Sequence, residues 1–253
     1  YELRVTNELE EVLFLDHLKL IAVEHDRDVE VYPNESLGIP TAGKRILYTV
    51  RDPKPPKSAI DGAGNDVRER IVSLDHKFYD SFKTTSIRGY SESHSLTLDL
   101  DERKGFNGRT ILLLTGWTDY AFSSDNLAAS QSGKSLFFPK LQVKDRSGTW
   151  RTVVDSIGIS VGRPQTVVVD LTGKFLSSSR EVRIVTNVKT YWDKIAVDTS
   201  EQQPISTTDL IPARAELRER GFSRARTFEG MIVPTYGQVV NDGRWKNFSG
   251  WFT

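Results

Sequence analysis

Apolar and polar residues alternate along this chain in short runs that are typical of β-strands. The clearest runs lie between residues 86 and 198, where clusters of glycine, asparagine and aspartate separate them. They cover residues 95–100, 109–114, 140–144, 150–154, 166–171, 181–186 and 194–198. About seven short strands at this spacing, without helical segments long enough for crossovers, predict a mainly β protein built as a β-sandwich or jelly roll.

The first fifty residues carry a second set of strand patterns, at residues 1–5, 18–23, 29–32 and 45–50. The polar residues 25–28 are expected to join the second and third of these strands as a hairpin. Residues 6–15 are compatible with one or two turns of helix, because an N-cap candidate precedes several acids. Three prolines within residues 53–56 then exclude a helix or a central strand.

The last fifty residues lose this regularity. Residues 206–209 are expected to cap a short helix, and residues 213–220 form the best helical window of the chain, which Gly221 would end. We therefore predict three parts. They are an N-terminal β segment with a proline-rich connection over residues 1–66, a β-sandwich domain over 67–200, and an irregular, partly helical tail over 201–253.

Composition narrows the classes of function. The 253 residues include 34 Lys and Arg, 34 Asp and Glu, and no Cys. The balanced charge argues against a nucleic-acid partner, and the lack of cysteine excludes disulfides and thiolate metal sites within this chain. No apolar run approaches the length of a membrane-spanning helix. Residues 1–35 hold ten acids against three bases. This segment is either a solvated acidic face or a surface for self-association into a homo-oligomer.

Catalytic and metal-binding motifs are scarce. The four histidines have no compact metal spacing, and no Gly-x-Ser-x-Gly motif occurs, so we predict no metal, no cofactor and no serine nucleophile. Asp61, Asn65 and Asp66 supply oxygen ligands at close spacing, as a calcium loop does, but the EF-hand pattern is absent and a turn is the favoured interpretation. The sequence does not exclude a pair of carboxylates that come together in the folded chain. A carboxylate-based hydrolase acting on glycans is therefore an alternative function. Its candidate residues are Asp119, Asp125, Asp155 and Asp193.

Aromatic residues give the strongest candidate for ligand binding. Two segments, residues 116–122 and 191–193, place Trp and Tyr beside Asp. Such rings stack on sugar faces while a carboxylate accepts hydrogen bonds from sugar hydroxyls. The predicted ligand-binding residues are Trp117, Asp119, Tyr120, Tyr191, Trp192 and Asp193. The alternative is that Trp117, Trp150 and Trp192 are core residues that close the sandwich.

Several segments, in their order along the chain, resemble one region of large bacterial proteins. They are residues 15–20, 29–35, 47–53, 141–145, 148–153, 169–175, 182–187, 191–195 and 217–223. These segments are similar to the region that follows the FG-GAP repeats in bacterial proteins of the FG-GAP, ASPIC/UnbV and tetratricopeptide-repeat type. Residues 141–154 and 191–193 also look like parts of galactose-binding-like sandwiches.

The resemblance implies an extracytoplasmic protein, secreted, periplasmic or on the cell surface, whose other domains would be the partners of this one. It carries no catalytic residues over to this chain. The chain begins with Tyr1 and ends just after an aromatic cluster, so we expect it to be a piece of a longer protein. The sequence thus predicts a non-catalytic module for interaction or scaffolding that binds carbohydrate or assembles with itself.

Overall fold

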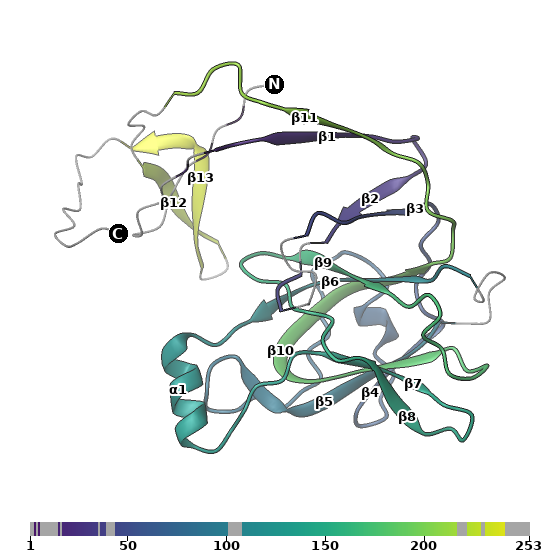
Figure 1. Cartoon of the computed structure of the whole chain (residues 1–253). Coiled ribbons are helices and arrows are strands. Elements are labelled where there is room, and N and C mark those ends of the chain that lie inside the picture. Colours follow the sequence, from purple (N-terminus) through teal and green to yellow (C-terminus); the bar gives the residue numbers. More distant parts are fainter. Residues whose placement is uncertain are drawn as a thin grey trace. The chain divides into compact units, whose positions relative to one another are not determined.

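A computed structural model describes residues 3, 5, 15, 17–34, 36–38, 44–100, 108–216, 222–228 and 231–240. The chain forms two units. The larger comprises residues 24–206, and the smaller comprises residues 1–23 together with 207–253. In both units the regular structure of the described residues is mainly β-strand (Figure 1).

Two antiparallel layers form the body of the larger unit, and one long strand belongs to both. The first layer contains β4 (Ser58–Asp61), β5 (Tyr90–Asp99), the first half of β10 (Glu181–Asp198), β7 (Lys140–Lys144) and β8 (Trp150–Val154), in this order. The second layer contains the other half of β10, β6 (Ile111–Asp119) and β9 (Gln165–Asp170). The curve of β10 from one layer into the other is visible in Figure 1.

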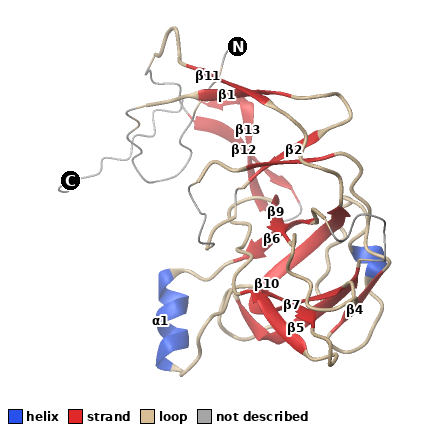
Figure 2. Cartoon of the chain, turned by 45° about the vertical axis from the view of Figure 1, so that its right-hand side comes forward, coloured by secondary structure: helices blue, strands red, loops and turns tan. Residues whose placement is uncertain are grey.

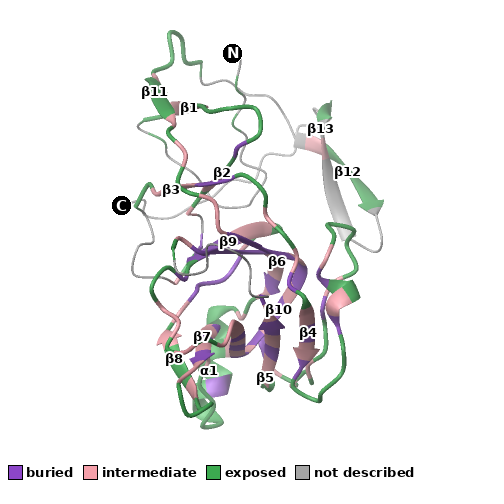
Figure 3. Cartoon of the chain, turned by 90° about the vertical axis from the view of Figure 1, so that its right-hand side faces the viewer, coloured by how far each residue is buried: buried purple, intermediate pink, exposed green. Residues whose placement is uncertain are grey.

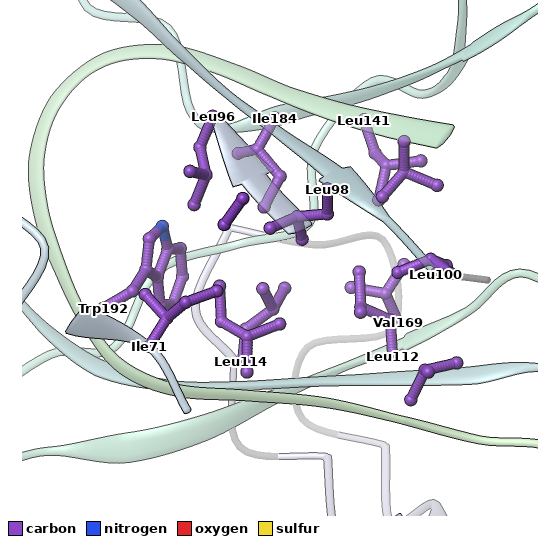
Figure 4. Close-up of a cluster of buried hydrophobic side chains, with 14 of the residues drawn as sticks. Ile71, Leu96, Leu98, Leu100, Leu112, Leu114, Leu141, Val169, Ile184 and Trp192 are labelled. Carbon is purple, nitrogen blue, oxygen red and sulfur yellow. The ribbon is translucent and has the colours of Figure 1, made fainter. Parts of the chain in front are cut away.

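The main core lies between these two layers. Strands of both layers contribute alternate side chains to it, as the period of a β-strand requires. Leu98 and Ile184 come from the first layer, Leu114 comes from the second, and Trp192 lies among them (Figure 4). The body is therefore a β-sandwich, as the strand spacing predicts.

A hairpin covers the outer face of the second layer. It consists of β2 (Glu30–Pro33) and β3 (Leu47–Val50), and Val50 packs there with Ile111, Leu113 and Val168. Strand β6 is consequently buried on both faces over its first four residues (Figure 3). This double burial explains why residues 111–114 read as an unbroken apolar run instead of alternating.

Helix is a minor component of the described chain (Figure 2). Helix α1 (Ser123–Gln131) follows β6, and the backbone N–H of Phe122 donates to the Asp125 carboxylate at its start. The 3-10 helix η1 (Arg68–Arg70) lies between β4 and β5. Among the residues described, neither helix is long and apolar enough to cross a membrane.

The described residues of the smaller unit form two pairs of strands. Strand β1 (Leu20–Glu24) pairs with β11 (Ser206–Leu210), and the Lys19 ammonium lies 2.8 Å from the Asp209 carboxylate. Strands β12 (Phe222–Phe228) and β13 (Met231–Val240) form an antiparallel hairpin.

Several predicted elements differ from those observed. The strands predicted at 181–186 and 194–198 are one continuous strand, β10. The hairpin predicted through residues 25–28 is wrong, because β1 pairs with β11 and β2 pairs with β3. The proline-rich residues 53–56 and the predicted end of the N-terminal segment at residue 66 both lie inside the larger unit, where β4 and β5 are neighbours in one layer.

The C-terminal part is also more regular than expected. Residues 206–209 belong to a strand instead of capping a helix, and residues 222–240 contain a β-hairpin. Residues 213–216 are not helical, and the remainder of the helix predicted at 213–220 lies outside the described residues. The same holds for residues 6–14 of the predicted N-terminal helix and for most of the strand predicted at 1–5.

Candidate functional site

Trp117 and Tyr191 form the centre of an aromatic cluster. They lie opposite each other on the antiparallel strands β6 and β10, so their side chains leave the same face of the layer. Their rings are stacked, with centroids 4.5 Å apart and planes 8° apart. Both residues are half-buried, so part of each remains accessible to solvent.

Four more rings extend this pair in both directions. On one side, Phe82 meets Tyr191 edge to face at 5.1 Å, and His94 stacks on Phe82 at 4.7 Å. On the other side, Phe78 meets Trp117 at 6.3 Å, and His76 meets Phe78 at 6.0 Å. We call these six residues the aromatic row: His76, Phe78, Trp117, Tyr191, Phe82 and His94.

The loop between η1 and β5 supplies three rings of the row, and buried groups hold that loop in place. Tyr79 is 1% exposed and forms a backbone bridge with Trp192. The Asp193 carboxylate accepts hydrogen bonds from the backbone N–H groups of Asp75 and His76, at 3.2 and 3.1 Å. These contacts fix the loop where Phe78 and Phe82 reach the Trp117–Tyr191 pair.

An open cleft of about 770 Å³ lies at the Phe82–His94 end of the aromatic row. It is lined by side chains from β4 and its turn, the loop before β5, β5 itself, β7 and β10. The polar groups among them are Asp61, Asn65, Asp80, Ser81, Lys83, Glu92, Ser93, Ser95, Gln142 and Arg183. The cleft thus places hydrogen-bonding and charged groups beside aromatic carbon.

Asp61 at the end of β4 shapes one wall of the cleft. Its carboxylate accepts hydrogen bonds from the backbone N–H groups of Ala63 and Asn65 and from the Asn65 side chain, at 2.9–3.0 Å. Burial opposes ionisation of Asp61, but these hydrogen bonds outweigh it and hold the pKa below its ordinary value. The turn predicted around Asp61, Asn65 and Asp66 is confirmed.

The described residues contain no group of three or more His, Cys, Asp or Glu side chains that could hold a metal ion.

His94 is held as a neutral ring. Burial lowers its pKa, against a smaller opposite effect of the hydrogen bond with the Glu92 carbonyl oxygen. The Nδ1 atom also lies 3.2 Å from the Ser91 hydroxyl. A neutral imidazole stacked on Phe82 extends the apolar strip of the row up to the cleft.

Only some of the six residues predicted to bind ligand lie in or beside the aromatic row. Trp117 and Tyr191 come together, and Asp119 lies beside them, 3.5 Å from both Arg88 and Lys189. Tyr120 is 37% exposed but contacts Phe122 rather than the row.

The prediction that Trp192 and Asp193 bind ligand is wrong. Each is 2% exposed, so neither can contact a ligand at the surface. Trp192 faces the core because side chains alternate along β10, and Asp193 has no paired residue on β6, at the register shift between Trp192 and Lys194. Trp192 is the core residue that the alternative interpretation predicts, whereas Trp117 and Trp150 are half-buried.

Sequence reasoning missed Phe78, Phe82 and His94. Phe78, Tyr79 and Phe82 give residues 78–82 a high aromatic density, which is the one signal that pointed to this loop. Their contacts with Tyr191 and Trp117 join positions more than 30 residues apart, so only the folded chain brings them together.

Comparison of the chain with family models, curated proteins and solved structures gives no match.

Proposed function

We propose that the larger unit is a non-catalytic binding module whose aromatic row and adjoining cleft bind carbohydrate. The observation that carries this proposal is the unbroken series of ring contacts from Phe78 to His94, which ends in an open polar cleft. A strip of partly exposed rings fits the apolar C–H faces of sugars, and nearby polar groups fit their hydroxyls.

The cleft supplies the polar half of this recognition. Asp80 and Glu92 are exposed carboxylates that would accept hydrogen bonds from sugar hydroxyls, and the Gln142 side chain also lines the cleft. Because the row is longer than one ring, the ligand we propose is an oligosaccharide or polysaccharide that lies along it.

The positions of the candidate carboxylates favour binding over hydrolysis. Asp119 faces two cations, Asp125 accepts the hydrogen bond at the start of α1, and Asp193 is buried on backbone donors. A general acid requires a raised pKa, whereas the pKa of Asp61 in the cleft is lowered. The glycan hydrolase therefore remains the weaker candidate.

The setting of this module is part of the same proposal. The segments that resemble the region after FG-GAP repeats support an extracytoplasmic location within a larger bacterial protein. Its sandwich would be of the galactose-binding-like, jelly-roll type. Fractionation of the native source, with an antibody against this chain, tests the location directly. Recovery from the cytoplasm would contradict it.

The binding proposal is tested by affinity electrophoresis and calorimetry against neutral and acidic polysaccharides. Tyr191→Ala and Phe82→Ala should abolish binding of any glycan that the wild-type chain binds, because each interrupts the row. Phe122→Ala is the matched control, since Phe122 is 45% exposed and contacts Tyr120 outside the row. Thermal melting of each variant would verify that it is folded. Absence of binding to every glycan, or equal binding by all variants, would refute the proposal.

A further inference from the structure

Arg183 is the most unusual charged group in the cleft. It lies on β10 between Thr97 of β5 and Gln142 of β7, and its side chain is half-buried. Its Nε–H donates a 2.9 Å hydrogen bond to the Gln142 side-chain oxygen. No described residue forms a hydrogen bond or an ion pair with its two terminal amino groups.

Neighbouring side chains fix the plane of this guanidinium. It lies over the Trp150 ring, 4.5 Å from the centroid. Gln142, which accepts from Arg183, is itself held by a 3.3 Å hydrogen bond from its amide nitrogen to the Thr152 hydroxyl. A guanidinium held in this way loses little conformational freedom when it binds an anion.

The nearby cation Lys144 does not share this role. Its ammonium also lies over the Trp150 ring, 5.1 Å from the centroid, but it is paired with the Glu181 carboxylate. No carboxylate of the described residues is paired with Arg183, and burial lowers the pKa of its guanidinium. The described cleft therefore contains one oriented, half-buried cation that lacks a counterion.

We propose that Arg183 binds the carboxylate of an acidic sugar, so that the ligand of the cleft is a polymer containing uronic acid. This inference rests on the proposed carbohydrate-binding function and deepens it. The planar fork of a guanidinium matches a carboxylate through two parallel hydrogen bonds, and its free terminal amino groups supply both donors.

The acidic residues of the cleft are compatible with an acidic ligand because they line other parts of the cleft than Arg183. Asp61 is on β4, two strands from Arg183, which is about 10 Å at the usual spacing of strands. Its carboxylate already has three donors. Glu92 lies 3.8 Å from the Lys83 ammonium, and Asp80 is exposed. A uronic acid has hydroxyls for these acceptors and one carboxylate for Arg183.

The experiment compares oligogalacturonate with its methyl ester, which has the same backbone without charge. Calorimetry on the full chain should show the acid binding roughly 10- to 100-fold more tightly, as expected for a charge-assisted hydrogen-bond pair. The preference should shrink as salt is raised, because part of it is electrostatic.

Three variants assign the preference to this side chain. Arg183→Gln should remove the preference for the acid. Arg183→Lys should retain only part of it, because lysine keeps the positive charge but lacks the planar guanidinium fork. Arg151→Gln is the matched control. It removes the same charge from β8, where Arg151 pairs with Asp145 outside the cleft lining. Thermal melting would check that each variant is folded.

Each outcome decides a different point. Equal binding of acid and ester, or an unchanged preference in Arg183→Gln, would overturn the role of Arg183 while leaving carbohydrate binding in place. Arg183-dependent binding of a sulfated oligosaccharide without binding of oligogalacturonate would overturn the assignment to a carboxylate. If only neutral glycans bind, the role of Arg183 is rejected and carbohydrate binding is retained. If no glycan binds, both proposals are rejected.

Discussion

Replacing Trp192 by alanine should remove the largest side chain of the main core. Trp192 is 2% exposed and packs between the two layers of the sandwich. Burial of a Trp removes about 150–250 Å² from water, which at about 25 cal/mol per Å² corresponds to roughly 4–6 kcal/mol. Alanine retains part of this, so we expect Trp192→Ala to lower the free energy of unfolding by about 3–5 kcal/mol.

The loss should be localised in the larger unit, so the assay is hydrogen exchange of peptides from β6 and β10. Urea unfolding followed by circular dichroism gives the accompanying change in free energy. Tyr191→Ala is the comparison, because Tyr191 is adjacent in sequence but half-buried, and it should cost clearly less. A loss below about 1 kcal/mol for Trp192→Ala, or a larger loss for Tyr191→Ala, would refute the assignment of these residues to core and surface.

Three further predictions concern groups around the site. Gly116→Ala should destabilise the larger unit by about 1–3 kcal/mol in urea unfolding, because an added Cβ would lie 2.1 Å from the Tyr191 carbonyl oxygen; an unchanged midpoint would contradict this. Asp193→Ala should cost about 1–3 kcal/mol and increase hydrogen exchange at His76, whose N–H would lose its acceptor; unchanged exchange there would count against it. Asp61 has a lowered pKa, so its contribution to stability is complete above the unfolded pKa and is lost as pH falls through the folded value. The stability gap between wild type and Asp61→Asn should therefore narrow below about pH 4 in urea titrations; a constant gap would show that ionised Asp61 has no such role.

The sandwich was predictable because its strands carry local signals. Residues 140–144 alternate between polar and apolar, and the apolar run at 111–114 indicates a buried strand; both segments are strands in the structure. The pairing of strands was less accessible. Strand β1 has its partner near residue 206, which no local pattern reveals. Helix α1 was missed because its sequence has no apolar periodicity, and only Ala129 is buried.

The candidate site was predictable only in part, for a related reason. Trp117 and Tyr191 are recognisable as candidates because each lies two residues before an Asp in the sequence. The difference between Tyr191 and Trp192 depends on which face of β10 is covered by the core, and Asp193 lies at a register shift; composition shows neither. The sequence alone does not show whether Arg183 pairs with an acid or binds an anion, because its contacts with Gln142 and Trp150 form only in the folded chain.

The most direct test of the aromatic row is a nuclear magnetic resonance titration that follows the indole N–H signals of the five tryptophans. Each signal is assigned from the spectrum of a Trp→Phe variant, and the chain is titrated with the neutral and acidic oligosaccharides. We predict that the Trp117 signal shifts with ligand while that of buried Trp192 stays unchanged. No shift at Trp117 with any of these ligands, or shifts confined to tryptophans outside the row and the cleft, would contradict the account.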